Sequence, residues 1–245
     1  MTIRLYDAHA HLGSMEEQEV RKQYNIYTLM NASSIEECQK IQELAKQNSW
    51  IVPTVGVHPW KADKITVEEL LPFLKSSPII GEIGMDSTWC EVPLDVQEQV
   101  FRKQLMLAQE LKKPVILHTK GQEARIREVI KPYTIPIIIH WYSEERYLRD
   151  YIAKDCYFTL GPEFKTSQAV QQVAKEVPLN RLLIETDGLE AMEWALNRKV
   201  LVNEIPDLLI EAMRYLAEIK QITLEQVAQQ IEENWNHLIK NKYIL

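Results

Sequence analysis

The sequence lacks the features that mark membrane-spanning or exported proteins. No run of about eighteen consecutive apolar residues occurs in the chain, so a transmembrane helix is not expected. The first residues, MTIRLYDAHAHL, do not place a basic region before a long apolar run, as a signal peptide does. The sequence therefore predicts neither a membrane span nor a secretory leader.

Cysteine is scarce, and its spacing carries no familiar motif. The three cysteines, Cys38, Cys90 and Cys156, lie far apart and form no C-x-x-C pair. An odd number of distant thiols argues against a disulfide framework or a zinc knuckle. Reduced thiols are typical of intracellular proteins, so we expect a cytoplasmic protein.

A surplus of positive charge is also missing. Lysine and arginine number 28 against 35 acidic residues, which gives a net charge of −7. Proteins that bind nucleic acid by neutralising phosphates usually carry a basic patch, so we expect no broad basic nucleic-acid surface. A small or nucleic-acid substrate would instead be held locally in the mouth of the fold, and no oligomeric state is predicted.

What the chain does contain is an alternation of strand and helix patterns. Eight mostly apolar segments are predicted as buried parallel strands: 3–9, 25–31, 50–58, 78–84, 114–118, 135–140, 156–160 and 181–187. Amphipathic helical segments follow them: 33–48, 67–75, 95–113, 144–155, 168–177, 205–219 and 223–239. Eight strands that alternate with helices within 245 residues predict an α/β fold of the TIM-like (β/α)8 barrel type. No linker, low-complexity tract or repeat divides the chain, so residues 1–245 are predicted to form one domain.

The first predicted strand carries Asp7, His9 and His11, spaced two residues apart. Residues at this spacing share one face of a strand, so the two imidazoles would converge on one point. Neutral imidazole is the commonest metal ligand in proteins. The pattern therefore predicts a metal site, although three polar residues in a loop after the strand would be an alternative interpretation.

Chemically active side chains end most of the other predicted strands. They are His58, Glu82, His118, His140 and Asp187, with Asp86 just beyond the fourth strand. Function gathers at the carboxyl ends of barrel strands, which are all at one face. Five of the six histidines lie at such strand ends. The sixth, His237, lies in the last predicted helix and is interpreted as a surface or packing residue.

Four imidazoles and two carboxylates suit two divalent ions better than one. Glu82, on a central strand, is the candidate to bridge two ions about 3.5–4 Å apart, and such a pair activates a water molecule. Asp187 would act as ligand and as general base. The alternative for Glu82 is a buried charge paired with lysine or arginine.

Six motifs together resemble the TatD family of metal-dependent hydrolases, within the amidohydrolase superfamily. They are D-A-H-A-H (7–11), G-V-H-P (56–59), G-E-I-G-M-D (81–86), P-V-I-L-H (114–118), His140 and E-T-D (185–187). They occur in the family's order across residues 7–187. The resemblance implies a barrel that holds one to three divalent ions, and many family members are deoxyribonucleases that remove nucleotides from DNA ends.

Carried over by position, the resemblance implies a role for each site residue. His9, His11 and Asp187 would hold one metal ion, His118 and His140 a second, and Glu82 would bridge them. Asp7 would orient an imidazole ligand through its far nitrogen. His58 would contact a substrate phosphate or support the site, with a hydrogen-bonded loop histidine as the alternative.

The substrate-facing loops depart from the family pattern. Thr119 and Lys120 replace the usual Ser-Arg, and Lys120 would grip a phosphate as a point charge. Trp141 begins a changed segment after His140, and Gly188 and Leu189 replace the usual small residue and proline after E-T-D.

Two tryptophans close to these loops have two possible roles. Trp60 and Trp141 would either stack on bases or pack within the loops.

These patterns predict an enzyme with two divalent ions, Zn, Mg or Mn. The resemblance implies a 3'-5' exodeoxyribonuclease or related phosphodiesterase that acts on DNA ends or short nucleic acids, with catalytic Glu82 and Asp187. Substrate contacts are expected from His58, Lys120 and Trp141. Two alternatives stay open: an amide or ester hydrolase on the same metal centre, and a catalytically quiet binding barrel.

Overall fold

Eight parallel strands form one sheet in the computed structural model, which describes residues 3–239. The strands are β1 (Tyr6–His11), β2 (Tyr27–Ala32), β3 (Ile51–Val55), β4 (Ile79–Gly84), β5 (Val115–His118), β6 (Ile137–Ile139), β7 (Tyr157–Leu160) and β8 (Leu182–Ile184). Each pairs with the next along the chain. The backbone N–H of Asp187, just after β8, donates to the carbonyl oxygen of His9 on β1 at 2.9 Å, which brings the two ends of the sheet together.

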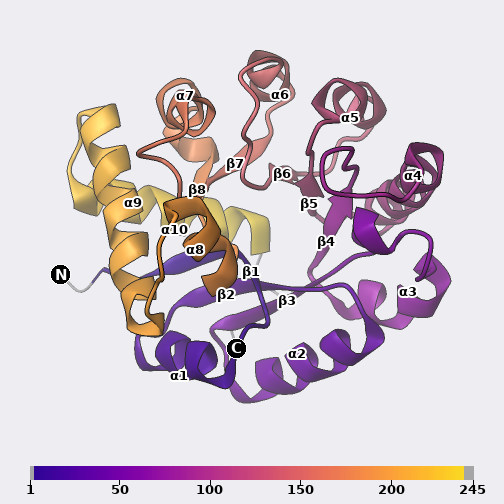
Figure 1. Cartoon of the computed structure of the whole chain (residues 1–245), viewed down its shortest axis with the longest axis horizontal. Helices are drawn as coiled ribbons and strands as arrows, with labels where there is room; N and C mark the ends of the chain where they lie inside the picture. Colours follow the sequence, from indigo (N-terminus) through magenta and orange to yellow (C-terminus); the bar gives the residue numbers. More distant parts are fainter. Residues whose placement is uncertain (1–2, 240–245) are drawn as a thin grey trace.

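Helices follow the strands and surround them (Figure 1). They are α1 (Met15–Gln23), α2 (Ile35–Gln47), α3 (Val67–Ser76), α4 (Leu94–Leu111), α5 (Glu123–Ile130), α6 (Leu148–Ala153), α7 (Gln168–Glu176), α8 (Leu189–Leu196), α9 (Ile205–Lys220) and α10 (Leu224–Ile239), with short 3-10 turns at Pro59–Lys61, Leu179–Arg181 and Val202–Glu204. The predicted (β/α)8 barrel is therefore confirmed. None of the helices within residues 3–239 is long and apolar enough to cross a membrane.

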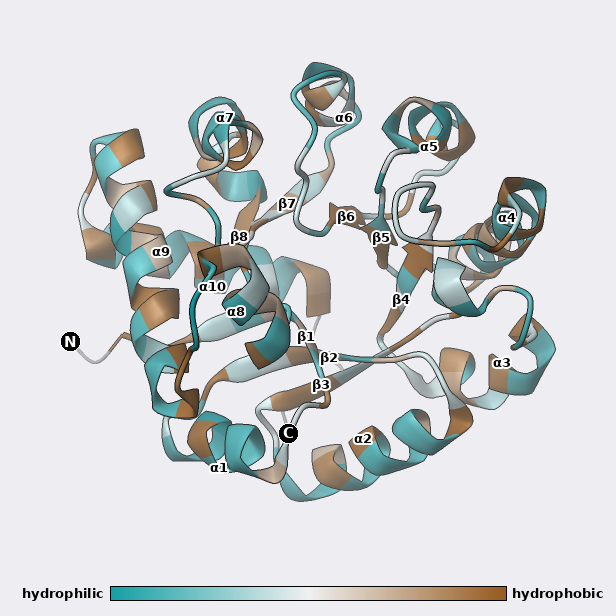
Figure 2. Ribbon diagram, viewed as in Figure 1, coloured by the Kyte–Doolittle hydropathy of each residue, from teal (hydrophilic) through white to brown (hydrophobic). Residues whose placement is uncertain are grey.

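The core lies between the strands and the inner faces of the helices. Strands β5, β6 and β8 are mostly brown in Figure 2, whereas the helices around them mix brown with teal. This contrast is expected where parallel strands are buried on both faces and each helix buries one stripe.

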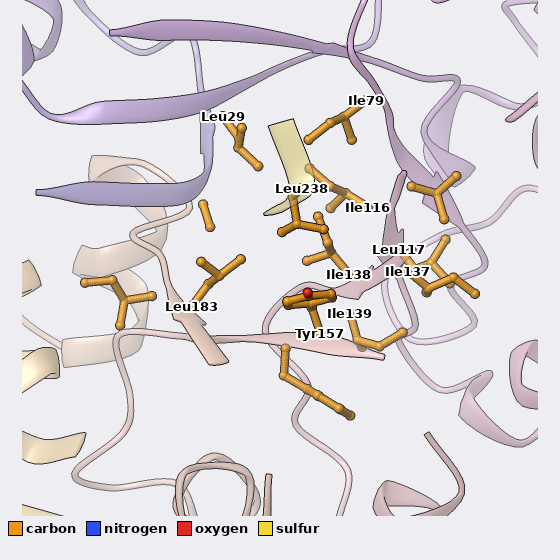
Figure 3. Close-up of a cluster of buried hydrophobic side chains, with 14 of the residues drawn as sticks. Leu29, Ile79, Ile116, Leu117, Ile137, Ile138, Ile139, Tyr157, Leu183 and Leu238 are labelled. Carbon is orange, nitrogen blue, oxygen red and sulfur yellow. The ribbon is translucent and has the colours of Figure 1, made fainter. Parts of the chain in front are cut away.

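Helix α10 closes one end of the barrel. Its Leu238 lies beside Ile116 and Ile138 in Figure 3, and all three belong to the same buried cluster. The side-chain amide of Asn234, also on α10, donates to the carbonyl oxygens of Leu179 and Leu182 at 2.9 and 2.7 Å. With this end filled, the carboxyl ends of the strands form the open face, where the site residues lie.

Three helices were not predicted from the sequence: α1, α5 and α8. Each has only eight or nine residues. The predicted strands 50–58 and 181–187 are also longer than β3 and β8, because their last residues leave the sheet to enter the site.

Candidate metal centre and active site

The carboxylate of Glu82, near the carboxyl end of β4, is the hub of the site. Its side chain is only 3% exposed. Five imidazoles from the strand ends surround it: His9, His11, His58, His118 and His140. No lysine or arginine within residues 3–239 forms an ion pair with Glu82, so the interpretation of this residue as half of an ordinary buried ion pair is wrong.

One oxygen of Glu82 faces the histidines of β5 and β6. Its Oε1 lies 2.8 Å from Nδ1 of His118 and 2.9 Å from Nε2 of His140. Nε2 of His58, which follows β3, lies 3.5 Å from the same oxygen. His58 therefore faces the carboxylate hub from just beyond the strand end.

The other oxygen of Glu82 faces β1 and the segment after β8. Its Oε2 lies 3.3 Å from Nε2 of His9 and 3.7 Å from Nε2 of His11. Oδ1 of Asp187 lies 3.3 and 3.4 Å from the same two nitrogens. The two sides of Glu82 thus meet two separate groups of nitrogen atoms, an arrangement that suits a carboxylate shared between two cations.

Several buried polar atoms of the site have no hydrogen-bond partner within the described residues. They are Nε2 of His9, Nδ1 of His140, both carboxylate oxygens of Glu185 and Oδ1 of Asp187. Buried polar groups are nearly always paired, so a cluster of unpaired ones needs an explanation such as a bound ion. Imidazole nitrogens and carboxylate oxygens are the donors that Zn, Mn and related divalent ions accept. The residues present therefore fit divalent cations.

Potential ligand atoms lie within 4.8 Å of one another in three groups. The groups are His9, His11 and Glu82; His58, Glu82 and His118; and His9, His140 and Glu185. Two of the three groups share Glu82. The third contains Glu185, which the sequence interpretation did not assign.

The far nitrogens of the imidazoles are fixed by polar neighbours. Nδ1 of His9 lies 2.9 Å from the amide nitrogen of Asn31, and Nε2 of His118 lies 3.0 Å from Oδ2 of Asp86. These two contacts fix ring orientation and tune how strongly a histidine binds metal. Nδ1 of His140 faces Oε1 of Glu185 at 3.4 Å without forming a hydrogen bond.

Asp7 does not orient an imidazole, so the role predicted for it is wrong. Arg21 of α1 donates from Nη1 to Oδ2 of Asp7 at 2.7 Å. Thr186 donates to the same carboxylate from its backbone N–H at 2.9 Å and from its hydroxyl at 2.6 Å. The guanidinium of Arg21 is fully buried, and it pairs with the Asp7 carboxylate in place of an imidazole. Asp7 consequently fixes the backbone that leads into Asp187.

Charges within the site shift several pKa values. Burial would raise the pKa of Glu82, but the imidazoles around it, His140 foremost, hold that pKa well below its ordinary value. Burial and the nearby His140 would lower the pKa of His9, yet Glu82 and Asp187 raise it to about 9. Burial would likewise raise the pKa of Asp187, but His9 lowers it. Both carboxylates are therefore ionised at neutral pH.

The other two buried histidines around Glu82, His118 and His140, also have shifted pKa values. Burial would lower the pKa of His118, but contacts with Asp86 and Glu82 raise it. The pKa of His140 lies well above its ordinary value, because Glu82 and Glu185 outweigh its burial. His58 differs, since burial lowers its pKa despite the neighbouring Glu82.

A cavity of about 470 Å³ opens above these ligands. The predicted substrate contacts His58, Lys120 and Trp141 all line it. Nζ of Lys120 donates to Oγ of Ser143 at 2.8 Å, and the indole N–H of Trp141 donates to Oε1 of Glu163 at 3.2 Å. The cavity therefore places two lysines, Lys61 and Lys120, and an aromatic wall that includes Trp141 beside the candidate metal centre.

Three residues of the site were missed or only partly understood in the sequence. Asn31 ends the second strand, where no role was assigned, although a polar residue at a strand end was a signal. Glu185 lies two residues before Asp187, the same spacing that singled out His9 and His11. Asp86 was noted as a neighbouring carboxylate, but its contact with His118 depends on the loop after β4.

Comparison with known proteins adds to this geometry. A family model described as "TatD related DNase" matches residues 6–240, which confirms the resemblance drawn from the motifs. A metal-dependent hydrolase of Bacillus subtilis, YabD, is 28% identical over 96% of this chain and 99% of its own length. A human protein named as a 3'-5' RNA nuclease is 25% identical over 64% of this chain and 22% of its own length.

Solved structures share the fold. The crystal structure of a TatD homologue from Escherichia coli superposes with a TM-score of 0.82 at 19% identity, covering 97% of this chain and 98% of its own. A TatD-family hydrolase from Entamoeba histolytica gives 0.77 at 17% identity, covering 97% and 98%. At these identities the likeness supports the barrel architecture alone.

Proposed function

The chain belongs to the TatD-related DNase family, and from this premise we propose that it is a metal-dependent phosphodiesterase that acts on DNA ends or short nucleic acids. The 3'-5' direction of an exodeoxyribonuclease is part of this proposal. The assignment to the TatD-type metal-dependent hydrolases, without a stated substrate, rests on the family match and on a relative described as a metal-dependent hydrolase. A cytoplasmic location is proposed as well, in keeping with three free cysteines.

The observation that carries the proposal is the Glu82 carboxylate between two groups of imidazoles. His9, His11 and Asp187 would hold one divalent ion on the Oε2 side. His118 and His140 would hold a second on the Oε1 side. The unpaired buried atoms of His9 and Asp187 support this assignment, because bound cations would satisfy them. Zn, Mn and Mg are the proposed ions.

Divalent cations bound there would lower the pKa of a water molecule and neutralise charge on a substrate phosphate. Asp187 is ionised, partly exposed and at the cavity wall, so its carboxylate would accept the proton of the attacking water. The water oxygen would form its bond to phosphorus as the bond from phosphorus to the sugar oxygen breaks, and the departing sugar oxygen would take up the proton that Asp187 accepted. Lys120 would hold a non-reacting phosphate oxygen as a point charge.

Nuclease assays on end-labelled oligonucleotides test the proposal. The metal-loaded protein should shorten single-stranded DNA from its 3' end, and chelation should abolish the activity. Glu82→Gln and Asp187→Asn should each lower kcat by about 100-fold or more. Met106→Ala, on the exposed face of α4, is the matched control and should leave kcat unchanged. RNA belongs in the same assay because a human relative is named as an RNA nuclease.

A protein that retains its metal but cleaves neither DNA nor RNA would overturn the substrate assignment. The second candidate, an amide or ester hydrolase on the same centre, would then gain support. One observation favours it: Glu37 and Glu163 also line the cavity, and their charges disfavour a polyanion. A screen of amide, lactone and phosphodiester substrates separates the two. A protein without affinity for Zn, Mn or Mg would instead indicate the catalytically quiet barrel.

A further inference from the structure

Four of the six tryptophans line the mouth of the cavity. They are Trp60, Trp89, Trp141 and Trp194, and each follows a different strand. Trp89 is 50% exposed and Trp194 is 60% exposed. Large aromatic residues contribute most when they are buried, so two half-exposed indoles at a cavity mouth indicate a surface that receives a ligand.

Trp89 and Trp194 meet across the barrel. Trp89 belongs to the loop between β4 and α4, whereas Trp194 belongs to α8, which follows β8 and lies inside the ring of outer helices in Figure 1. Strands β4 and β8 are four positions apart in the eight-strand order, so they stand on opposite sides of the barrel. The two rings nevertheless touch edge to face, with centroids 5.9 Å apart and planes at 83°.

Trp141 extends the same contact along the wall. Its ring centroid lies 6.0 Å from that of Trp194, again edge to face. Trp141 is anchored through its indole N–H on Glu163. Within residues 3–239, no hydrogen bond holds the indole N–H of Trp89 or Trp194. The anchored ring of Trp141 therefore forms a fixed wall against Trp194, and the rings of Trp89 and Trp194 are held by side-chain packing without a hydrogen bond to either indole.

We propose that Trp89 and Trp194, with Trp141 as a wall, form a tryptophan bridge that stacks on one unpaired base and bars a strand that continues across the mouth. This inference rests on the proposed function, because the base must belong to a phosphodiester at the metal centre. It goes further by assigning specificity for a free end, or for a nucleotide-sized phosphodiester, to particular residues.

A cation lies directly beside the bridge. Nζ of Lys120 lies 4.6 Å from the centroid of the Trp89 ring. Lys120 covers one face of the Trp89 ring, so a base that stacks on the bridge beside it would have its phosphate within the reach of Lys120. The candidate metal ligands Glu82 and Asp187 line the same cavity. Stacking on aromatic rings accepts every base, since each has a π-face, and it requires that the base be unpaired.

The dimensions agree with a small occupant. The cavity of about 470 Å³ lies in the range for sites that enclose drug-sized ligands, of about 300–1,000 Å³. A duplex has a groove about 12 Å wide and is much larger than such a cavity. A single nucleotide at a chain end is small enough for this cavity, whereas a paired or continuing strand would meet the two rings that line it.

The first test measures binding without requiring cleavage. Metal-loaded protein is titrated with deoxyadenosine monophosphate and with deoxyribose 5-phosphate, which lacks the base. We expect the nucleotide to bind about tenfold more tightly, with the difference lost in Trp89→Ala and Trp194→Ala. Trp89→Phe should retain part of the difference, and Met106→Ala all of it. Equal affinity for the two ligands in the wild-type protein, or an undiminished difference in both alanine variants, would overturn the base-stacking role.

The second test compares linear and covalently closed circular single-stranded DNA of one sequence. The wild-type protein should cut only the linear form. Trp89→Ala or Trp194→Ala should cut the circle at a measurable rate, at least tenfold above the detection limit that bounds the wild-type rate. Cleavage of the circle by the wild-type protein, or resistance of the circle to both variants, would refute the barrier. If neither DNA is cut by any protein, the proposed function fails, and the binding test still decides whether the bridge stacks on bases.

Discussion

The buried ion pair beneath the site allows a quantitative prediction about Asp7. Asp7 and Arg21 are both fully buried, and their charged atoms lie 2.7 Å apart. Arg21 also donates to the hydroxyls of Thr28 and Thr186, each at 3.1 Å. The variant Asp7→Asn keeps the shape of the side chain but leaves the guanidinium without its counter-charge. We expect this change to lower the free energy of unfolding markedly.

The magnitude follows from the cost of an unpaired buried charge. Removing one partner of a buried ion pair costs about 3–5 kcal/mol. Domains are commonly stable by about 5–15 kcal/mol, so Asp7→Asn should remove a large part of the total. For a chain of this size, each kcal/mol lowers Tm by about 2–4 °C, which gives a decrease of about 6–20 °C.

Urea unfolding of the chelator-treated protein, followed by tryptophan fluorescence, measures the effect. The matched control is Arg198→Met, which removes a pair of similar length between Arg198 and Glu204 at the surface. Exposed pairs contribute about 0–1 kcal/mol, so this control should change little. The contrast isolates burial as the cause.

A double variant decides whether the unpaired charge is responsible. Asp7→Asn combined with Arg21→Met leaves no buried charge, so it should be less destabilised than the sum of the two single variants by more than about 1 kcal/mol. Additive effects, or an Asp7→Asn variant that loses less than about 1 kcal/mol, would contradict the reasoning. The ion pair would then contribute little to the free energy of unfolding, and the hydrogen bonds to Thr28 and Thr186 would account for the packing of Arg21.

Three further predictions concern the metal centre and the cavity. Glu82→Gln should lower the divalent metal content measured by elemental analysis, because the bridging charge is lost; unchanged content would show that Glu82 is not a ligand. In chelator-treated protein, the pKa of His9 near 9 exceeds its unfolded value of about 6.5, so its stabilising contribution is complete below about pH 6.5 and is lost as the pH rises through 9. The free energy of unfolding should therefore be lower at pH 9.5 than at pH 6.5. A higher value at pH 9.5 would contradict the raised pKa of His9. Lys120→Ala should raise KM for an oligonucleotide about tenfold or more with a smaller effect on kcat, whereas Lys120→Arg should restore part of the loss; a KM that neither variant changes would exclude the phosphate contact.

The arrangement of the ligands was predictable because it depends on strand periodicity. His9 and His11 share one face of β1, and the other candidates end separate strands, so closure of a parallel barrel brings them to one face. Glu82 became the expected centre for the same reason. These predictions required only the period of a strand and the direction of the chain.

Contacts that depend on loops and on the inner face of a helix were not predictable in this way. Arg21 reaches Asp7 from α1, a short helix with few apolar residues whose orientation is set by packing. Asp86 reaches His118 because the backbone after β4 turns back, with Gln97 donating to the carbonyl oxygen of Asp86 at 3.0 Å. Sequence spacing gives no measure of such tertiary contacts, so the partner of Asp7 was assigned wrongly.

Protons and divalent cations compete for the same ring of ligands. The pKa values of His9, His118 and His140 are all raised, because carboxylates beside them favour the positively charged imidazole. A metal ion requires these imidazoles to be neutral, and it satisfies the same carboxylates, Glu82 above all. Metal binding would therefore release protons, and its affinity should increase as the pH rises through about 9, where His9 loses its proton. The buried Glu82 that would bind a cation is thus also the group that would make metal binding sensitive to acid.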